Sequence, residues 1–411
     1  MERTVFMRKY IDLVRYDRPY NSLPCILITI IGIIGALNSL MVILTEQESF
    51  EKRVLGVKEF LTITLIISNS LELALKPHKN TRLMELIEDE FLVNRIEFFR
   101  RDEKWKQFET YYNETKIQME KTSKNIFAVF VVAYLGFINK SLFNELLRYS
   151  IGLERNSIDL PAPYAYWSPT HVNQFEFFVY IYIFQSLMIF IYTIETYCIQ
   201  ISVSLATERL LADFGTIFIL IEHLSKDFPE FEITDRIRHE THQQDNENYN
   251  VRAQHENLKR DMSRIVRCHQ RLIRNFKDCE TNAGYAIIVI SLVIFTNSCV
   301  DFFIILKGDN LMTKINYGVS CILINLVILY PYNTGQRIAN QNEILRQSLT
   351  NLPWIDKPRW FKKTLQIMMI RVNVDIVMNP YGLHYLNYMS FKNIIKTSYT
   401  FGNFLFQTAL N

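Results

Sequence analysis

The sequence predicts an all-α membrane protein with seven membrane-spanning helices, and two properties of the 411-residue chain lead to this fold class. Hydrophobic residues make up 49% of the chain and charged residues 21%, yet the mean hydropathy is slightly positive. Apolar and charged residues must therefore be segregated along the chain, as they are in proteins that cross a bilayer several times. Seven apolar stretches are candidates for such crossings, which is the second property.

The first candidate span, residues 19–45, follows a basic N-terminal segment that lacks a signal-peptide cleavage pattern, so we expect this span to be retained. The other six candidates are residues 60–75, 126–143, 177–205, 285–306, 315–332 and 391–410. Three acids, Glu72, Glu195 and Asp301, lie inside or at the edges of these spans, where a charge needs a partner or water. We expect each acid to face protein. The alternative for Asp301 is a cation-attracting position at a pore mouth.

The distribution of basic residues predicts the orientation of the spans. The 45 Lys and Arg residues lie on one alternate set of connections, except for Lys52, Arg53, Lys58, Lys140, Arg148, Arg155, Lys307 and Lys314. The positive-inside rule places the strongly basic set in the cytosol, and the N-terminus with it. An odd number of spans then puts the C-terminus outside the cell, which is the reverse of a G-protein-coupled receptor.

Three long segments on the predicted cytosolic side mix charged residues with regularly spaced apolar ones. They cover about residues 81–124, 206–280 and 337–385. This pattern is typical of amphipathic helices. We expect the helices to continue the membrane spans and to bundle into one cytosolic anchor layer, so that residues 1–411 form a single seven-helix domain.

The composition points away from several other functions. A net charge of +3 gives no nucleic-acid footprint. The six cysteines all fall in candidate spans or cytosolic connections, so no extracellular disulfide is expected. The eight histidines are scattered, and neither a Ser/His/Asp pattern nor a phosphate-binding loop occurs. We therefore expect no metal, no cofactor and no enzymatic activity.

The last candidate span, residues 391–410, carries a polar stripe along one side. On a helix with 100° per residue, five polar residues fall within about 40° of Phe404: Asn393, Thr397, Thr400, Thr408 and Asn411. One apolar ring in a row of hydroxyls and amides is typical of a pore-lining helix with a hydrophobic constriction. The alternative is a helix that packs in a bundle through small polar contacts.

The last quarter of the chain resembles the ligand-tuned subunits of insect odorant receptors. Five short motifs agree with that family in order and spacing: residues 332–336 (YNTGQ), 347–354 (QSLTNLPW), 361–363 (FKK), 370–371 (IR) and 395–401 (IKTSYTF). The chain departs from the family at Phe401, where a second Tyr is usual, and at Gly402, where a large apolar residue is usual. Its shorter length and different tail distinguish it from the shared co-receptor.

The resemblance implies an odorant-gated, nonselective cation channel in the plasma membrane of sensory-neuron dendrites. Four subunits, tuned chains together with the odorant receptor co-receptor, would surround one pore among membrane lipids, and no G protein would be required. The terminal helix would line the pore, with gate residues Asn393, Thr397, Thr400, Phe401, Phe404 and Thr408. Matching Thr400 and Gln407 to the tail of the family selects Phe404 and Thr408, which the polar stripe selects independently.

The resemblance also implies a site for a small, volatile, mostly apolar odorant, between the second, third, fourth and sixth spans. To within a helical turn, its residues would be Thr64, Ile67, Phe137, Tyr180, Phe184, Tyr317, Ser320 and Cys321. Aromatic walls with one or two hydroxyls suit such a ligand; ordinary bundle core is the alternative for each residue. Trp354, Trp360 and Phe361 are expected in the subunit-joining anchor, with docking on the membrane surface as the alternative.

Two other functions remain open from the sequence. The first is a related gustatory-receptor-type ligand-gated cation channel, because Thr400-Phe401 and Gln407-Thr408 resemble the C-terminal motif of gustatory receptors. The second is a secondary transporter, which predicts paired inverted halves with broken helices near the membrane midplane. No such pairing is evident in the sequence.

Overall fold

The chain folds into a bundle of long α-helices in a computed structural model, and the residues it describes contain no β-strand. The structure describes the chain except residues 1, 15–17, 19–21, 47–49, 99–101, 151–166, 168–173, 230–243, 309–310 and 411. The side chains of residues 2–7, 97, 102, 133, 137–150, 174–176, 178, 244–251, 312 and 410 are also outside the described part.

The described helices run in the order α1 (Glu2–Val14), α2 (Leu23–Thr45), α3 (Phe50–Leu75), α4 (His78–Glu88), α5 (Asp102–Ser150), α6 (Gln174–Asp227), α7 (Gln244–Lys307), α8 (Leu311–Thr350), α9 (Arg359–Val372) and α10 (Tyr388–Leu410). Two short 3-10 helices, η2 (Arg95–Phe98) and η4 (Pro380–Gly382), lie in the connections. The seven predicted spans coincide with parts of α2, α3, α5, α6, α7, α8 and α10. Several helices extend far beyond a span: α6 has 54 residues and α7 has 64, where about 20 suffice to cross a bilayer.

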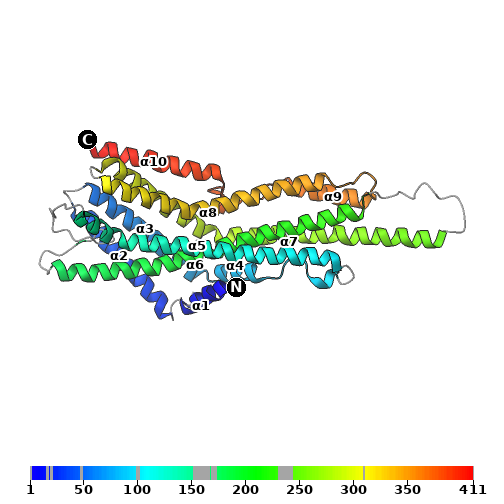
Figure 1. Ribbon diagram of the computed structural model, residues 1–411, viewed down its shortest axis with the longest axis horizontal. Coiled ribbons are helices and arrows are strands. Elements are labelled where there is room, and N and C mark those ends of the chain that lie inside the picture. The colour runs from blue at the N-terminus through cyan, green and yellow to red at the C-terminus, as the bar shows by residue number, and fades with distance from the viewer. Residues whose placement is uncertain are drawn as a thin grey trace.

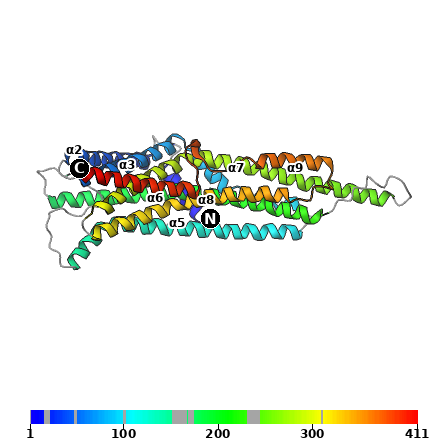
Figure 2. The ribbon, with the colours of Figure 1, turned by 90° about the horizontal axis from the view of Figure 1, so that it is seen from above.

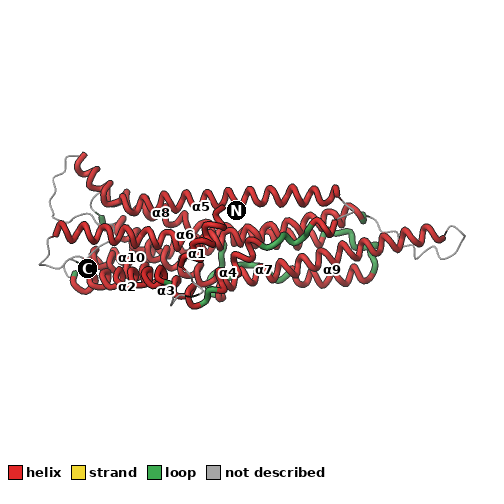
Figure 3. The backbone as a smooth tube through the Cα atoms, turned by 90° about the horizontal axis from the view of Figure 1, so that it is seen from below, coloured by secondary structure: helices red, strands yellow, loops and turns green. Residues whose placement is uncertain are grey.

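The helices lie roughly along one long axis, and the two ends of the molecule differ (Figure 1). One end, called here the apolar end, contains α2, α3, α10 and the adjoining parts of α5 to α8. The other, called the polar end, contains α9 and the opposite parts of α5 to α8. Figures 2 and 3 show that the long helices continue from one end into the other.

The apolar end exposes large hydrophobic side chains over whole helix faces. On α2, Ile26, Leu27 and Leu37 are 40%, 47% and 56% exposed. Pro24 in the first turn and Ser22 at the N-cap, whose Oγ accepts from the Cys25 amide at 3.3 Å, fix where this helix begins. Such extended apolar surfaces are typical of contact with lipid or with another protein.

Length and hydropathy qualify five of the described helices to cross a membrane. They are α2, α3, and the segments Val179–Asp227 of α6, Arg252–Lys307 of α7 and Thr313–Thr350 of α8. The predicted spans in α5 and α10 are not among these five. In α10 the reason is its composition, because two lysines and the polar stripe lower the hydropathy of the segment.

The three acids predicted near membrane depth face protein. Asp301 is fully buried and accepts a hydrogen bond from the Lys58 ammonium at 2.9 Å. Glu72 pairs with Lys79, and Glu195 is 1% exposed. The alternative of Asp301 as a residue at a pore mouth is therefore wrong, because its carboxylate is buried inside the bundle and paired with Lys58.

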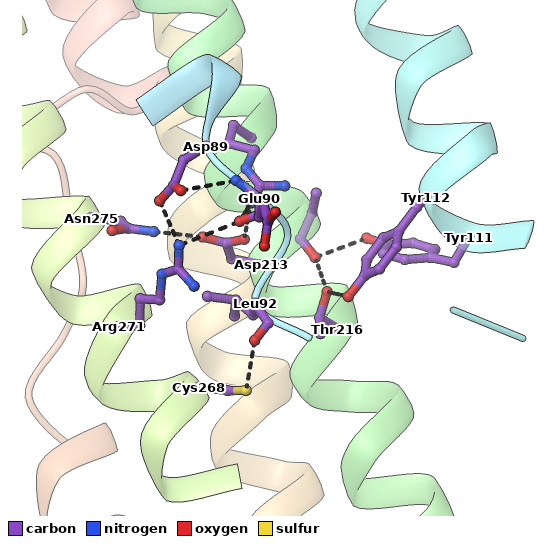
Figure 4. Close-up of polar contacts among 12 residues, drawn as sticks. Asp89, Glu90, Leu92, Tyr111, Tyr112, Asp213, Thr216, Cys268, Arg271 and Asn275 are labelled. Carbon is purple, nitrogen blue, oxygen red and sulfur yellow. Dashed lines mark hydrogen bonds and ion pairs between the residues drawn. The ribbon is translucent and has the colours of Figure 1, made fainter. Parts of the chain in front are cut away.

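Polar contacts fix the connection between α4 and α5 inside the polar end (Figure 4). The guanidinium of Arg209 on α6 donates to the Glu90 carbonyl at 2.7 Å and lies 4.0 Å from the centroid of the Phe91 ring. The Phe91 ring in turn stacks on Tyr112 of α5 at 3.9 Å. The connection thus ties α5 to α6.

The carboxylate of Asp213 completes this buried network. Asp213 is 0% and Arg209 2% exposed, with 3.6 Å between Nη2 and Oδ1. Asn275 of α7 donates to Asp213 Oδ2 at 3.0 Å, and Arg271 binds Asp89. Helices α6 and α7 therefore share one charge network with the connection that precedes α5.

We predict that Asp213→Ala lowers the free energy of unfolding by about 3–5 kcal/mol, because it leaves the buried Arg209 guanidinium without its carboxylate. Thermal unfolding of the purified receptor in detergent measures the effect. The double variant Arg209→Met/Asp213→Leu should regain most of the loss, since it removes both charges.

The matched control is Glu222→Ala, which breaks an exposed pair with Lys226 on the same helix. This change should cost less than about 1 kcal/mol. Equal melting temperatures for Asp213→Ala and Glu222→Ala would contradict a structural role for the buried network.

Candidate functional site

A cavity of about 200 Å³ lies inside the apolar end, between α3, α5, α6, α7 and α8. We call it the central cavity. Aliphatic and aromatic side chains form most of its wall: Ile63, Ile66, Phe130, Tyr134, Ile189, Tyr192, Ile199, Val289, Ile290, Val293, Ile294, Ile324 and Val327. An apolar cavity of about 150 Å³ is enough to bind benzene. The central cavity therefore has room for a compound somewhat larger than benzene.

A few polar groups also line the central cavity. The side-chain amide of Asn297 on α7 donates to Thr62 Oγ1 at 3.0 Å and to the Val293 carbonyl at 2.7 Å. Asn69 on α3 is 5% exposed, and its Oδ1 has no hydrogen-bond partner among the described residues. A mostly apolar wall with a small number of fixed polar groups is typical of a small-molecule site.

Charged residues line the central cavity as well. Lys58, Glu59 and Glu195 reach its wall, and each of the three is at least nine-tenths buried. The ammonium of Lys58 is bound by Asp301 on the opposite helix α7. The charge of Lys58 is thereby neutralised, and the pair holds α3 against α7 beside the cavity.

Seven of the eight residues predicted for ligand binding have described side chains, and none of these seven lines the central cavity, although several lie within a helical turn of residues that do. On α3, Thr64 is exposed and Ile67 is half-buried, while Ile63 and Ile66 reach the cavity. The side chain of Phe137 lies outside the described residues, and Tyr134, one turn earlier on α5, lines the cavity.

On α8 the displacement is similar. The half-buried Tyr317 lies under Lys58, whose ammonium is 5.8 Å from the ring centroid. Ser320 is half-buried, and Cys321 is buried, with its carbonyl accepting from Asn325 at 2.8 Å. The cavity is reached instead by Ile324, one turn further along the helix.

Tyr180 and Phe184 of α6 border a different hollow, of about 250 Å³, between α2, α3 and α6. We call it the side hollow. Tyr180 is 74% exposed there and Phe184 is half-buried. The prediction missed the contribution of α7 altogether, although Val289, Val293 and Asn297 form one wall of the central cavity. The α7 segment is apolar on most of its faces, so its sequence gives little signal for which face meets a cavity.

The polar stripe of α10 lies on the surface of the chain. Phe401 and Phe404 are 50% and 58% exposed, with ring centroids 6.0 Å apart. The polar members of the stripe, Asn393, Thr397, Thr400 and Thr408, are exposed too. Thr400 and Thr408 each donate to the carbonyl four residues earlier, so their hydroxyl protons are satisfied and their oxygens face outward.

The opposite face of α10 packs against α7. Gly402 is buried there. A Cβ at this position would lie 2.8 Å from both the Cys299 carbonyl oxygen and the Phe302 Cβ, so any larger residue would clash with α7. Tyr399 meets Phe302 edge-to-face, with centroids 5.6 Å apart. Gly402 thus allows close approach of two helix backbones, and the two faces of α10 differ sharply in what they contact.

The three predicted anchor residues lie at the polar end. Phe361 is 1% exposed in its core, and the half-buried Trp360 donates from Nε1 to His255 Nε2 at 2.8 Å. Trp354 is 45% exposed. Phe361 and Trp360 therefore pack within the chain, whereas Trp354 is available for another surface.

A comparison with protein families identifies the chain. Residues 57–399 match the model of the family described as 7tm Odorant receptor. The chain belongs to the odorant receptor family. The match covers most of this odorant receptor and identifies it as a membrane protein of olfaction, a receptor rather than an enzyme. No curated protein sequence matches it.

Solved structures of a similar protein share its fold. The insect olfactory receptor OR5 from Machilis hrabei in complex with eugenol has a TM-score of 0.68 to this receptor, with 11% sequence identity. The structure of OR5 from Machilis hrabei described without eugenol gives a TM-score of 0.66 at the same identity. Both alignments cover 98% of this chain and 99% of the OR5 chain.

Proposed function

We propose that this receptor is the odorant-binding subunit of an odorant-gated, nonselective cation channel, a heterotetramer formed with the odorant receptor co-receptor. The observation that carries the proposal is the stripe on α10, where hydroxyls, an amide and two aromatic rings are exposed along one face. The other face of α10 is fixed on α7. A ring of subunits places such a face toward a common axis, where polar groups meet water and ions. Gating then requires no G protein.

We further propose seven membrane crossings, by α2, α3, α5, α6, α7, α8 and α10, in the plasma membrane of sensory-neuron dendrites. The basic residues place the N-terminus and the polar end in the cytosol and the C-terminus outside. Helix α10 crosses although its hydropathy is modest, because the stripe faces a water-filled pore instead of lipid. At the apolar end, the exposed apolar surface that lipid does not cover is covered by the co-receptor subunits.

The odorant site of the proposal is the central cavity. Its volume and largely aliphatic wall suit a small, volatile, mostly apolar compound. Asn69 and Asn297 add polar groups to this wall. The olfactory receptor OR5 from Machilis hrabei, which shares the fold, has been solved in complex with eugenol, a compound of the same general class.

We predict that Val293→Phe, which fills part of the central cavity, raises the half-maximal odorant concentration at least tenfold. The larger ring takes up space that the odorant would occupy, so the odorant loses van der Waals contacts with the cavity wall. Currents from the receptor co-expressed with the co-receptor are the measurement. Tyr180→Ala and Phe184→Ala, which alter the side hollow, should change the dose–response curve less. The opposite order would place the odorant in the side hollow.

The gate prediction concerns Phe404. In the closed channel its ring would repel water at the narrowest point, with Thr408 one turn further outward. Phe404→Ser should therefore raise odorant-free current or alter ion selectivity in the heteromer, diluted by the side chains of the co-receptor.

Two outcomes would argue against this role of Phe404. Unchanged basal current and permeability ratios at normal surface expression would remove Phe404 from the pore. Reduced surface expression alone would indicate that the ring packs against a neighbouring helix. Leu326→Ser, at an exposed apolar position of α8 (49% exposed), is the matched control for placing a hydroxyl on an apolar surface.

We also propose that the polar end is the subunit-joining anchor. Large apolar side chains are exposed there on α9 and in the turn before it: Trp354, Ile355, Ile367 and Ile370. Lys362 and Lys363 lie on the same helix, so attraction to anionic lipid is the rival explanation.

Trp354→Ala is predicted to reduce co-purification of the receptor with its co-receptor, because a half-exposed indole of this kind commonly anchors a protein interface. Pull-down from co-expressing cells measures the complex. Lys362→Gln/Lys363→Gln is the control for lipid attraction. Loss of assembly in the lysine variant, with a normal complex for Trp354→Ala, would favour the membrane instead of the partner.

A further inference from the structure

The helix that carries two residues of the central cavity also contacts the base of the proposed gate helix. Ile324 and Val327 of α8 line the cavity, and Pro331 follows within the same helix. Proline has no N–H, so the carbonyl of Val327, four residues earlier, loses its helical hydrogen bond. The weakest point of the α8 backbone ladder therefore lies directly after the cavity.

Residues just beyond Pro331 grip the chain that leads into α10. Tyr332 is fully buried, and its hydroxyl is hydrogen-bonded to Nε2 of His384. The Tyr332 ring lies 5.4 Å from the imidazole centroid and 5.7 Å from the ring centroid of Phe391, in the first turn of α10. The first residue of α10, Tyr388, makes a second contact with α8: its hydroxyl donates to Asn333 Oδ1 at 2.5 Å.

A backbone contact reinforces these side-chain contacts. A Cβ at Gly335 would overlap the carbonyl oxygen of Leu386. The α8 backbone therefore touches the segment before α10 directly, with no flexible side chain to absorb a displacement of either. We call the set Tyr332, Asn333, Gly335, His384, Leu386, Tyr388 and Phe391 the α8–α10 clamp.

The protonation of His384 suits this arrangement. Burial lowers the pKa of His384 below its ordinary value, so the imidazole is neutral at physiological pH and its Nε2 can accept the Tyr332 proton. The backbone amide of His384 donates to Asn379 Oδ1 at 3.0 Å, and the amide of Asn379 donates to Glu280 of α7 at 2.8 Å. These two hydrogen bonds order the segment that leads into α10, of which His384 is part.

Helix α7 provides the fixed frame. It also lines the cavity and packs on α10, but it is tied to α3 by the Asp301–Lys58 pair and by the Asn297–Thr62 hydrogen bond. Among the described residues, α8 has no such ion pair at the cavity, and it carries the proline. Helix α8 is held by hydrogen bonds from Asn325 to Ser298 of α7 and from Tyr330 to Glu208 of α6, so a bend at Pro331 leaves the buried Asp301–Lys58 ion pair intact.

We propose that the α8–α10 clamp transmits odorant binding from the central cavity to the gate helix, with Tyr332 and His384 as positioning residues. The inference rests on the proposed gating role of α10. A ligand that displaces Ile324 and Val327 bends α8 at Pro331, and the clamp moves the base of α10 with it. A ligand shifts the channel only as far as it favours the bent state over the straight one.

The test separates binding from gating in the receptor co-expressed with its co-receptor. Eugenol, toluene and hexan-1-ol are the probes, and the compound that evokes the largest current is used throughout. Tyr332→Phe and His384→Gln should each raise the half-maximal concentration by about three- to tenfold and lower the maximal current. The rise in melting temperature that the same compound gives to the purified complex should be retained, since the cavity is intact.

Two further variants complete the design. The double variant Tyr332→Phe/His384→Gln should be no worse than either single one, because both remove the same hydrogen bond. Tyr330→Phe is the matched control: its hydroxyl donates to Glu208 of α6 at 3.0 Å, on the same helix but away from α10. Tyr330→Phe should change neither the half-maximal odorant concentration nor the rise in melting temperature that the odorant gives.

The outcomes distinguish the clamp from the channel proposal. In a Phe404→Ser background, odorant-free current should be insensitive to Tyr332→Phe if the clamp acts through the gate. A normal basal current for Phe404→Ser alone would count against the gate. Unchanged half-maximal concentrations for Tyr332→Phe at normal surface expression, or loss of the melting-temperature shift in parallel with the current, would overturn the clamp.

Discussion

The packing of α7 against its neighbours at the apolar end is the constraint on which the rest of the structure depends. A buried polar group there is costly unless it has a protein partner, and α7 provides several such pairs. Asp301 binds Lys58 of α3, and Ser298, three residues earlier, accepts from Asn325 of α8 at 3.0 Å. On its other side α7 receives α10 so closely that Gly402 is required. The central cavity and the proposed gate helix α10 therefore lie against two different faces of α7. Polar contacts with its neighbours fix the position of α7.

The surfaces left exposed by a single chain are of two kinds, and their chemistry assigns them different neighbours. The outer face of α2 is uniformly aliphatic, which suits lipid. The stripe of α10 alternates hydroxyls with the rings of Phe401 and Phe404, a surface that lipid would solvate poorly and an aqueous pore would solvate well. Burial alone does not separate these surfaces, since both are exposed; the pattern of side chains does.

The sequence predicted some of these features and not others, for physical reasons. Apolar runs predict where helices cross, and the polar stripe predicts the exposed face of α10, because in both the signal is the solvation of the side chains themselves. Helical spacing does not tell how a buried helix is rotated against its neighbours. That rotation depends on contacts such as Lys58 with Asp301, and on Gly32, where a Cβ would overlap the Tyr192 hydroxyl. The predicted pocket residues are therefore about one turn from the cavity on α3, α5 and α8, and the wall from α7 is missed. The lengths of α6 and α7 also depend on packing at the polar end.

The small size of the cavity sets a demand on the proposed coupling. The best small ligands gain at most about 1.5 kcal/mol per non-hydrogen atom, so a benzene-sized compound has roughly 10 kcal/mol of contact energy in total. Moving a two-state equilibrium from 1:99 to 99:1 requires about 5.5 kcal/mol of difference between the states. Half of all ligand contacts would then have to differ between closed and open channel. In a flexible connection, side-chain rearrangements would absorb that free-energy difference. The backbone contact of Gly335 with Leu386 leaves little room for such rearrangements. A direct backbone contact between α8, which is weakened at Pro331, and the segment before α10 is thus the arrangement by which so small a ligand can move α10.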